Sequence, residues 1–289
     1  MLDETKERYV KLANNFYAKY MCGAEINIES ITKCLLAHAV NFQPAYFRRL
    51  KNAIAYELSS KGDKEIGERV LRIKNPVTAK GSVLQKKPKP IRAKFFTDED
   101  LKSFASYLVK AGFAEEFAAI SLIRLTGARP VELRTMQVKK SLLFIKGAKK
   151  TNGLRGADRL LTIKDESDQD VITESLRLIK ASSKSMDAIR HRLRIEAKKM
   201  WPRRTMVPSM YSMRHQVGSN LKASSMSKEK VAYIMGHQST NSVRRYGNKR
   251  RGDAFAMSVE PACLADLSLI RDKVKLERPD YFKNLIFDE

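Results

Sequence analysis

The first seventy or so positions of the chain carry apolar residues at helical spacing. Two sets recur at intervals of three or four, the first made of Tyr9, Leu12, Phe16 and Tyr20 and the second of Ile31, Leu35 and Ala39. The segments 45–58 and 65–73 continue this pattern. Because such intervals place side chains on one face of an α-helix, residues 1–75 are predicted to form a small helical bundle without strands.

A stretch of different composition follows, over residues 76–96. It contains Gly81, Pro88 and Pro90, and between Asn75 and Lys94 it has basic residues but no acidic one. Proline disfavours helix, and uncompensated positive charge repels itself unless an anion is close. We interpret this stretch as an extended linker that lies along phosphates, and the DNA contacts expected in it are Lys86, Lys87, Lys89 and Arg92.

A second folded region begins at Thr97, which has the character of a helix N-cap ahead of Leu101 and Phe104. A nearly apolar helix is predicted over 113–125. The chain breaks at Gly127 and restarts at Pro130, a residue suited to the first turn of a helix because its missing N–H would be unpaired there. Arg129 is therefore expected at a helix entrance.

Two short apolar runs, 142–145 and 160–163, predict strands joined by a basic loop, and helices are predicted over 172–179, 186–200, 211–221 and 227–235. In the last thirty residues, Leu264, Leu267, Ile270 and Val274 recur at helical spacing. We interpret residues from about 260 to 289 as a docking helix. It would either join neighbouring subunits or pack on its own domain.

The net charge of the chain narrows the class of partner that it can bind. The chain has 289 residues with 56 Lys and Arg against 32 Asp and Glu, a net charge of +24, so a polyanion is the expected partner. No apolar run is long enough to span a membrane, and no leader is evident at the N-terminus. Cys22, Cys34 and Cys263 lack metal-site spacing and are odd in number. A protein of the cytoplasm that binds nucleic acid, without membrane contact or metal, is expected.

Breaking a phosphodiester without a metal requires a nucleophile, cations that hold the non-bridging oxygens, and a proton donor for the leaving alkoxide. The sequence has no Walker loop, no HExxH pair and no clear acidic metal cluster. It does have Arg, Lys, His and Tyr in specific local contexts after Thr97.

These contexts are three motifs and a tyrosine. Residues 126–133 read TGARPVEL, residues 211–215 read YSMRH, and residues 235–237 read MGH. Arg214 and His237 lie 23 positions apart, and His237 and Tyr246 lie 9 apart. The chain from about Thr97 to Arg251 thereby resembles the tyrosine recombinase, or phage integrase, family of site-specific recombinases.

The resemblance implies a role for each motif residue. Arg129 and Arg214 would clamp the scissile phosphate, which suits the paired donors of a guanidinium. His237 would donate a hydrogen bond to the phosphate or take part in proton transfer, and Tyr246 would be the nucleophile that forms a 3′-phosphotyrosyl link. Glu132 would orient Arg129 or the loop lysine, and His215 would be a buried hydrogen-bonding residue.

The catalytic lysine of the family lies in the loop between the two strands. Lys150 is our choice because it lies at the expected turn, and Lys146 and Lys149 are alternatives that would otherwise contact DNA. Arg244 and Arg245 are further expected DNA contacts.

One residue departs from the family pattern. Tyr211 occupies a position where most members have His. A phenol can donate a hydrogen bond to a phosphate oxygen, but it does not act as a base near neutral pH as imidazole does.

The sequence thus predicts a mainly α protein. A helical core-binding domain (1–75) and a linker (76–96) would precede a mostly helical catalytic domain with a small antiparallel sheet (97–289). The resemblance implies a homotetramer on a double-stranded recombination site, no cofactor, accessory DNA-bending or directionality factors, and integration or excision of a phage or other mobile element in a prokaryotic or host cell. A type IB topoisomerase-like enzyme and a non-catalytic DNA-binding protein are the alternatives.

Overall fold

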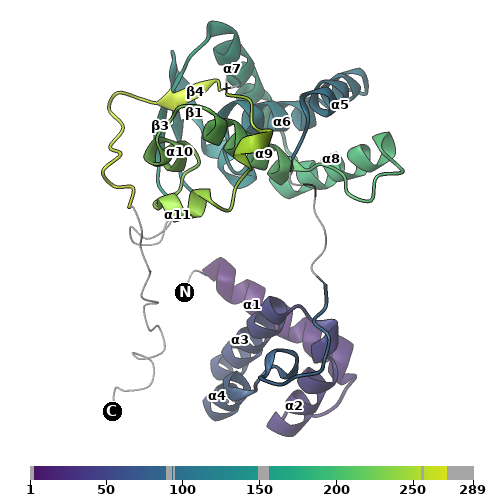
Figure 1. Ribbon diagram of the computed structural model, residues 1–289. Coiled ribbons are helices and arrows are strands. Elements are labelled where there is room, and N and C mark those ends of the chain that lie inside the picture. The colour runs from purple at the N-terminus through teal and green to yellow at the C-terminus, as the bar shows by residue number, and fades with distance from the viewer. Residues whose placement is uncertain (1–2, 89–92, 94, 149–155, 255–256, 272–289) are drawn as a thin grey trace. The chain divides into compact units, whose positions relative to one another are not determined.

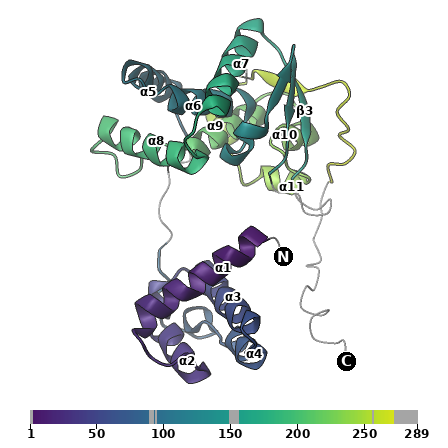
Figure 2. The same cartoon turned by 180° about the vertical axis from the view of Figure 1, so that it is seen from behind.

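The computed structural model describes residues 3–88, 93, 95–148, 156–254 and 257–271. The chain forms two compact units, residues 1–90 and residues 91–289, and each has its own hydrophobic core. The division falls inside the stretch that the sequence predicts to be a linker. Figures 1 and 2 show the helices and strands of both units.

Unit 1 is entirely helical in its described part. Its helices are α1 (Asp3–Phe16), α2 (Ile28–Ala37), α3 (Pro44–Ser60) and α4 (Lys64–Arg72), with a π-helical turn after α1 (Tyr17–Met21) and 3-10 turns at Ala39–Asn41 and Pro76–Thr78. Of the apolar residues that the spacing places inward, Phe16, Ile31 and Leu35 are at most 1% exposed, and Tyr9, Leu12 and Tyr20 are half-buried. The predicted helical bundle is confirmed.

Unit 2 is mostly helical with one small sheet. Its helices are α5 (Asp98–Lys110), α6 (Ala114–Thr126), α7 (Glu166–Ala181), α8 (Met186–Met200), α9 (Met210–Ala223), α10 (Lys228–Ile234) and α11 (Thr240–Val243), with 3-10 turns at Pro130–Thr135 and Lys249–Arg251. Figures 1 and 2 show α6 and α9 in the middle of this unit, between the sheet and the pair α5 and α8. The predicted mainly α fold with a small antiparallel sheet is confirmed.

The sheet has four strands, β1 (Gln137–Lys139), β2 (Leu142–Ile145), β3 (Arg159–Ile163) and β4 (Val259–Pro261). They pair antiparallel in the order β1-β2-β3-β4, with Leu143 opposite Leu161 and Thr162 opposite Glu260. Burial alternates along β3, so Arg159, Leu161 and Ile163 all point into the core. The sequence pattern identified β2 and β3 but neither β1 nor β4, each of which is three residues long.

Helix ends follow the local chemistry of the sequence. The hydroxyl of Thr97 accepts a hydrogen bond from the Asp100 N–H, and that of Ser227 accepts one from the Lys230 N–H, as expected of N-caps. Gly127 ends α6 with φ +66°, a left-handed conformation that favours glycine. Pro130 opens a six-residue 3-10 turn rather than an α-helix, and β1 begins one residue after this turn ends.

The prediction of a helix from about residue 260 is wrong for the part of this segment that the structure describes. Pro261 ends β4, and the chain continues in turns to Arg271, which pairs with the backbone beside Ser239. Leu264 is 86% exposed and only Ile270 of the apolar series to that point is buried, so the helical spacing does not form a buried stripe. Residues 272–289 lie outside the described residues.

The core of unit 2 gives a stability prediction. Leu122 lies fully buried in the middle of α6, so Leu122→Ala should lower the free energy of unfolding by about 2–5 kcal/mol. Val109 on α5 is 59% exposed, and Val109→Ala should change it by less than about 0.5 kcal/mol. Urea unfolding followed by the fluorescence of Trp201, the only tryptophan, reports on this unit because the indole packs against Phe104. Equal effects of the two substitutions would contradict this core.

Candidate functional site

Arg129 lies where α6 ends and the 3-10 turn Pro130–Thr135 begins. The left-handed Gly127 turns the chain, and Arg129 is the N-cap of the new turn. Its backbone N–H donates to Glu132 Oε2 at 2.9 Å, and its Nη1 donates to Glu132 Oε1 at 2.7 Å. Its Nη2 donates to the carbonyl of Gly236 at 2.9 Å. The guanidinium is therefore held between a carboxylate and the end of α10, with 11% of the side chain exposed.

Glu132 is fully buried, and a second arginine shares it. Arg159 Nη2 donates to Oε2 at 2.7 Å, and Arg159 Nη1 donates to Oε1 at 3.4 Å. Burial alone would raise the pKa of Glu132, but attraction and hydrogen bonding from Arg159 and then Arg129 outweigh it and hold this pKa at about 2. The carboxylate is ionised at any working pH.

Arg214 supplies a third guanidinium from α9. It is completely buried, and its two Nη groups donate to the carbonyls of Gly127 and Met235. Burial, then repulsion from Arg129 and Arg159, lowers the pKa of Arg214 to about 9. The side chain still carries its charge near neutral pH.

His237 comes shortly after α10, directly behind the left-handed Gly236 (φ +63°). The backbone N–H of His237 donates to the Ala232 carbonyl at 2.8 Å, which fixes the turn, and the side chain is buried. Burial first, then the charges of Arg214 and Arg129, lowers the pKa of His237 to about 2. The imidazole is consequently neutral and carries one N–H donor.

Tyr246 lies between two imidazole rings. Its ring centroid is 4.9 Å from that of His237 and 5.0 Å from that of His215, and the guanidinium carbon of Arg214 is 5.2 Å from it. The next residue, Gly247, has φ +66° and donates its N–H to His215 Nδ1 at 3.3 Å. A Cβ at Gly247 would lie 2.2 Å from the backbone nitrogen of Ser219, so glycine lets this segment lie directly on α9.

The cluster has more positive than negative charge and unfilled hydrogen-bonding capacity. Three guanidiniums surround one carboxylate. Eight buried side-chain N or O atoms lack a hydrogen-bond partner in the described part of the chain, and four of them are here: Arg159 Nε, Arg214 Nε, His237 Nδ1 and Gln238 Oε1. Buried cations without matching anions are costly, so the arrangement is suited to an anion with several acceptor oxygens.

The structure gathers Arg129, Glu132, Arg214, His237 and Tyr246 from a stretch of more than one hundred positions, together with His215. Tyr211 opens the same helix as Arg214 but is 44% exposed.

Of the expected DNA contacts, Lys146, Arg244 and Arg245 are exposed in unit 2. Lys86 and Lys87 are exposed in unit 1, where the Lys87 ammonium donates to the Asn41 carbonyl at 2.9 Å.

The remaining expected residues, Lys89, Arg92, Lys149 and Lys150, lie outside the described residues. The residues that flank the last two are nevertheless fixed at the cluster. The Ala148 N–H donates to Glu132 Oε1 at 3.3 Å, and the Gly156 carbonyl accepts from Gln238 Nε2 at 3.3 Å.

Arg159 is the member of the cluster that the sequence reasoning missed. Its signal was present in the alternation of β3, because Arg159 has the same inward phase as Leu161 and Ile163. A charged residue at an inward strand position requires a buried partner, and Glu132 is that partner.

Within the described residues, no three His, Cys, Asp or Glu side chains lie together in a way that could hold a metal ion. None of the described helices has the length and apolar character needed to cross a membrane.

Comparison with known proteins bears on the fold. No protein-family model matches the sequence, and no curated protein matches it either. Among solved structures, a lambda integrase dimer bound to a COC′ core site has a TM-score of 0.59 at 14% identity, covering 88% of this chain and 73% of that chain. A lambda integrase tetramer bound to a Holliday junction has a TM-score of 0.59 at 14% identity, covering 86% and 73%.

The Tn1549 transposon integrase in complex with transposon right end DNA has a TM-score of 0.54 at 12% identity, covering 86% of this chain and 90% of that chain. These proteins are tyrosine recombinases. At such identities the likeness concerns the fold, and the chain has the tyrosine recombinase fold, as its motifs suggested.

The buried His237 makes stability depend on pH. The unfolded chain takes up a proton at this imidazole near pH 6.5, whereas the folded chain does not until about pH 2. The free energy of unfolding should therefore fall as pH decreases below about 6.5, by up to about 1.4 kcal/mol per pH unit from this group. Glu132 adds a loss of the same sign only below about pH 4.5.

The measurement is urea unfolding of unit 2, followed by Trp201 fluorescence at pH 7.5, 6.5, 5.5 and 5.0. His237→Asn should flatten the dependence in this range, and His191→Asn, at an exposed position of α8, is the matched control. An unchanged slope in His237→Asn would contradict the neutral, buried imidazole.

Proposed function

We propose that this chain is a site-specific DNA recombinase that cleaves and rejoins DNA through a covalent link to Tyr246. The observation that carries the proposal is the cluster itself. Two guanidiniums share one buried carboxylate, and a third guanidinium and a neutral imidazole pack against the ring of Tyr246. The tyrosine recombinase fold and a net charge of +24 support a DNA substrate.

The chemistry needs neither metal nor ATP. The Tyr246 hydroxyl gives its proton to water and its oxygen attacks the scissile phosphorus. The P–O5′ bond breaks, and the leaving 5′-oxygen takes a proton from the proposed loop lysine. Arg129 and Arg214 stabilise the charge that grows on the non-bridging oxygens, and the neutral His237 donates its N–H to one of them. The phosphotyrosyl bond retains the energy of the broken backbone, so a 5′-hydroxyl from another strand can reverse the step.

Two assignments in this scheme rest on the resemblance. Lys150 is the proposed donor to the leaving oxygen, with Lys146 and Lys149 as alternatives, and the anchoring of Ala148 beside Glu132 supports a donor from this loop. Tyr211 is proposed to donate a hydrogen bond to the phosphate where the family has His. Its exposure leaves its hydroxyl accessible to DNA.

The assembly is also a proposal. The lambda integrase structures are a dimer on a core site and a tetramer on a Holliday junction, and we infer a homotetramer on two DNA sites for this chain. Integration or excision of a phage or other mobile element in a prokaryotic or host cytoplasm is the proposed role, with accessory factors that bend DNA or set direction.

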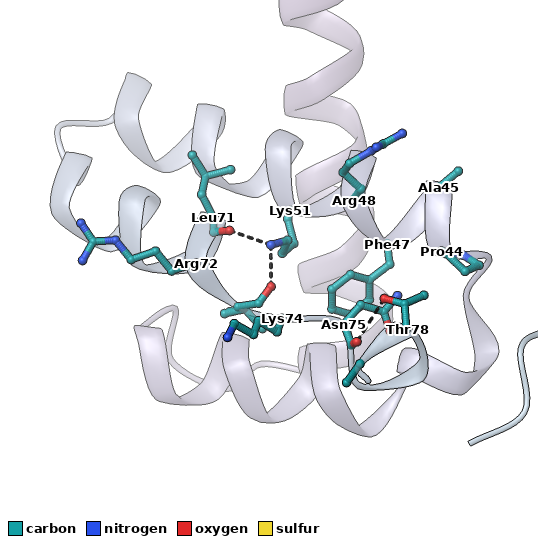
Figure 3. Close-up of a pocket in the computed structure, with 12 residues that line it drawn as sticks. Pro44, Ala45, Phe47, Arg48, Lys51, Leu71, Arg72, Lys74, Asn75 and Thr78 are labelled. Carbon is teal, nitrogen blue, oxygen red and sulfur yellow. Dashed lines mark hydrogen bonds between the residues drawn. The ribbon is translucent and has the colours of Figure 1, made fainter. Parts of the chain in front are cut away.

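Unit 1 is proposed to hold the DNA backbone as the core-binding domain. It has a hollow of about 590 Å³ between the start of α3 and residues 71–79, and the charged residues that line it are Arg48, Lys51, Arg72 and Lys74. The Lys51 ammonium donates to the carbonyls of Leu71 and Ile73 at 2.7 and 2.5 Å, and Figure 3 shows it turned toward Leu71. With no carboxylate in its lining, the hollow is suited to phosphate.

The nucleophile assignment is tested with nicked suicide duplexes made from the DNA that flanks the chain's own coding sequence. The full chain should form a covalent adduct that survives denaturing electrophoresis, and Tyr246→Phe should form none because the attacking oxygen is gone. Tyr211→Phe, the matched control, should slow adduct formation about tenfold through loss of one hydrogen bond. DNA binding without an adduct would favour the non-catalytic alternative, and relaxation of supercoils without strand exchange would favour the topoisomerase.

The proposed backbone contact of unit 1 has its own test. Replacing both Arg48 and Lys74 by Glu should weaken DNA binding, and it should lower the slope of log affinity against log salt by about one for each phosphate that the variant no longer binds. The control carries the same charge change at Lys11 and Lys33, which are exposed and do not line the hollow. Equal salt slopes for the two double variants would contradict a specific contact at the hollow.

A further inference from the structure

Arg159 is one of the three fully buried charges of the cluster, with Glu132 and Arg214, and it has no place in the chemistry proposed above. Its side chain is as buried as that of Arg214, but both of its Nη groups donate to the carboxylate of Glu132. It lies on β3 opposite Ile145 of β2, and within the described residues its side chain donates hydrogen bonds only to Glu132. Apart from the field of its charge, Arg159 can therefore act on a bound phosphate only through the groups that it contacts, above all Glu132.

Glu132 is shared in a way that constrains Arg129. Each carboxylate oxygen accepts one bond from Arg129 and one from Arg159, and Oε1 also accepts the Ala148 N–H. Arg129 consequently places only Nη1 of its guanidinium on the carboxylate and directs Nη2 to the Gly236 carbonyl. Without Arg159 the carboxylate would be open to a paired, fork-like contact with Arg129, the arrangement that Arg and carboxylate prefer.

Packing restricts the two guanidiniums further. A Cβ built on Gly236 would lie 2.0 Å from Arg159 Nη1 and 3.0 Å from Arg129 Nη1, so both groups lie against the same glycine. Gly236 directly precedes His237. Arg159, fixed in a strand, thus limits where Arg129 can lie relative to the turn that carries the imidazole.

The following inference rests on the proposed function. We propose that Arg159 is a positioning residue for cleavage. It occupies one side of Glu132 and so keeps the Arg129 guanidinium turned toward the scissile phosphate. The positive charge of Arg159 adds to that of Arg129 and Arg214 around the bound anion. Its loss should slow cleavage more than it weakens DNA binding, because most of the binding energy comes from phosphate contacts elsewhere.

The test is a double-mutant cycle on the full chain with the flanking-DNA suicide duplexes. The variants are Arg159→Met, Arg159→Lys, Glu132→Gln and the combination of Glu132→Gln with Arg159→Met, which removes both charges of the pair. The matched control is Arg134→Met, which removes an arginine of the 3-10 turn that donates to the Ser182 carbonyl instead of the cluster. Three quantities are measured: the rate constant of adduct formation at saturating protein, the DNA dissociation constant, and the thermal midpoint by Trp201 fluorescence.

We expect Arg159→Met to slow the rate constant about 100-fold and Arg159→Lys about tenfold, since Lys keeps the charge but offers no planar fork. DNA affinity should change less than about threefold, and Arg134→Met should cleave within about threefold of the wild-type rate. In the Glu132→Gln background, Arg159→Met should slow cleavage by less than about a further threefold, because the two residues act through one contact.

Several outcomes would overturn the proposal. One is cleavage by Arg159→Met within threefold of wild type. Another is a double variant whose rate constant falls by the product of the factors measured for Glu132→Gln and Arg159→Met alone. A third is a lower thermal midpoint and lower adduct yield at an unchanged rate constant, which would mean that Arg159 only supports the fold. Should Arg159→Met not fold, Arg159→Lys and the double variant decide by the same criteria. Absence of an adduct with the wild-type chain would instead contradict the proposed function, and this inference with it.

Discussion

The organisation of unit 2 depends on one buried carboxylate. Glu132 accepts hydrogen bonds from Arg129 and Arg159, and Arg214 lies close enough for both guanidiniums to lower its pKa. Taking charges out of water is expensive unless the geometry is good and other hydrogen bonds complete it, and removal of one partner leaves an uncompensated charge. The 3-10 turn, β3, α9 and the end of α10 must therefore meet at one point for any of these charges to be tolerated.

The same constraint prepares the site for an anion. One carboxylate does not balance three guanidiniums. Burial first, and then this excess positive charge, holds the pKa of His237 at about 2 and keeps its imidazole neutral. A neutral imidazole adds a hydrogen-bond donor without adding a fourth buried cation. The ring of Tyr246 lies against it, so the proposed nucleophile is held beside the donors that would stabilise its product.

The sequence predicted much of this because local signals were strong. These signals lie between residues that are close in the sequence. They are the glycine and proline near Arg129, the serine and threonine N-caps, and the spacing of Arg214, His237 and Tyr246. Arg159 was missed because its role depends on a partner 27 positions away, and three-residue strands such as β4 give too little alternation to detect. The prediction of a helix after residue 260 was wrong. The start of this segment pairs with β3 as β4, and of the apolar residues at helical spacing only Ile270 is buried within the described part.

The most direct test of the account is to identify the amino acid that carries DNA in the covalent adduct. Nuclease and trypsin treatment followed by mass spectrometry should find the nucleotide remnant on the peptide from Tyr246 to Lys249, which trypsin releases after Arg245. A remnant on the peptide from Thr205 to Arg214, which contains the exposed Tyr211, would contradict the account, because the attacking hydroxyl would then belong to a residue outside the buried cluster.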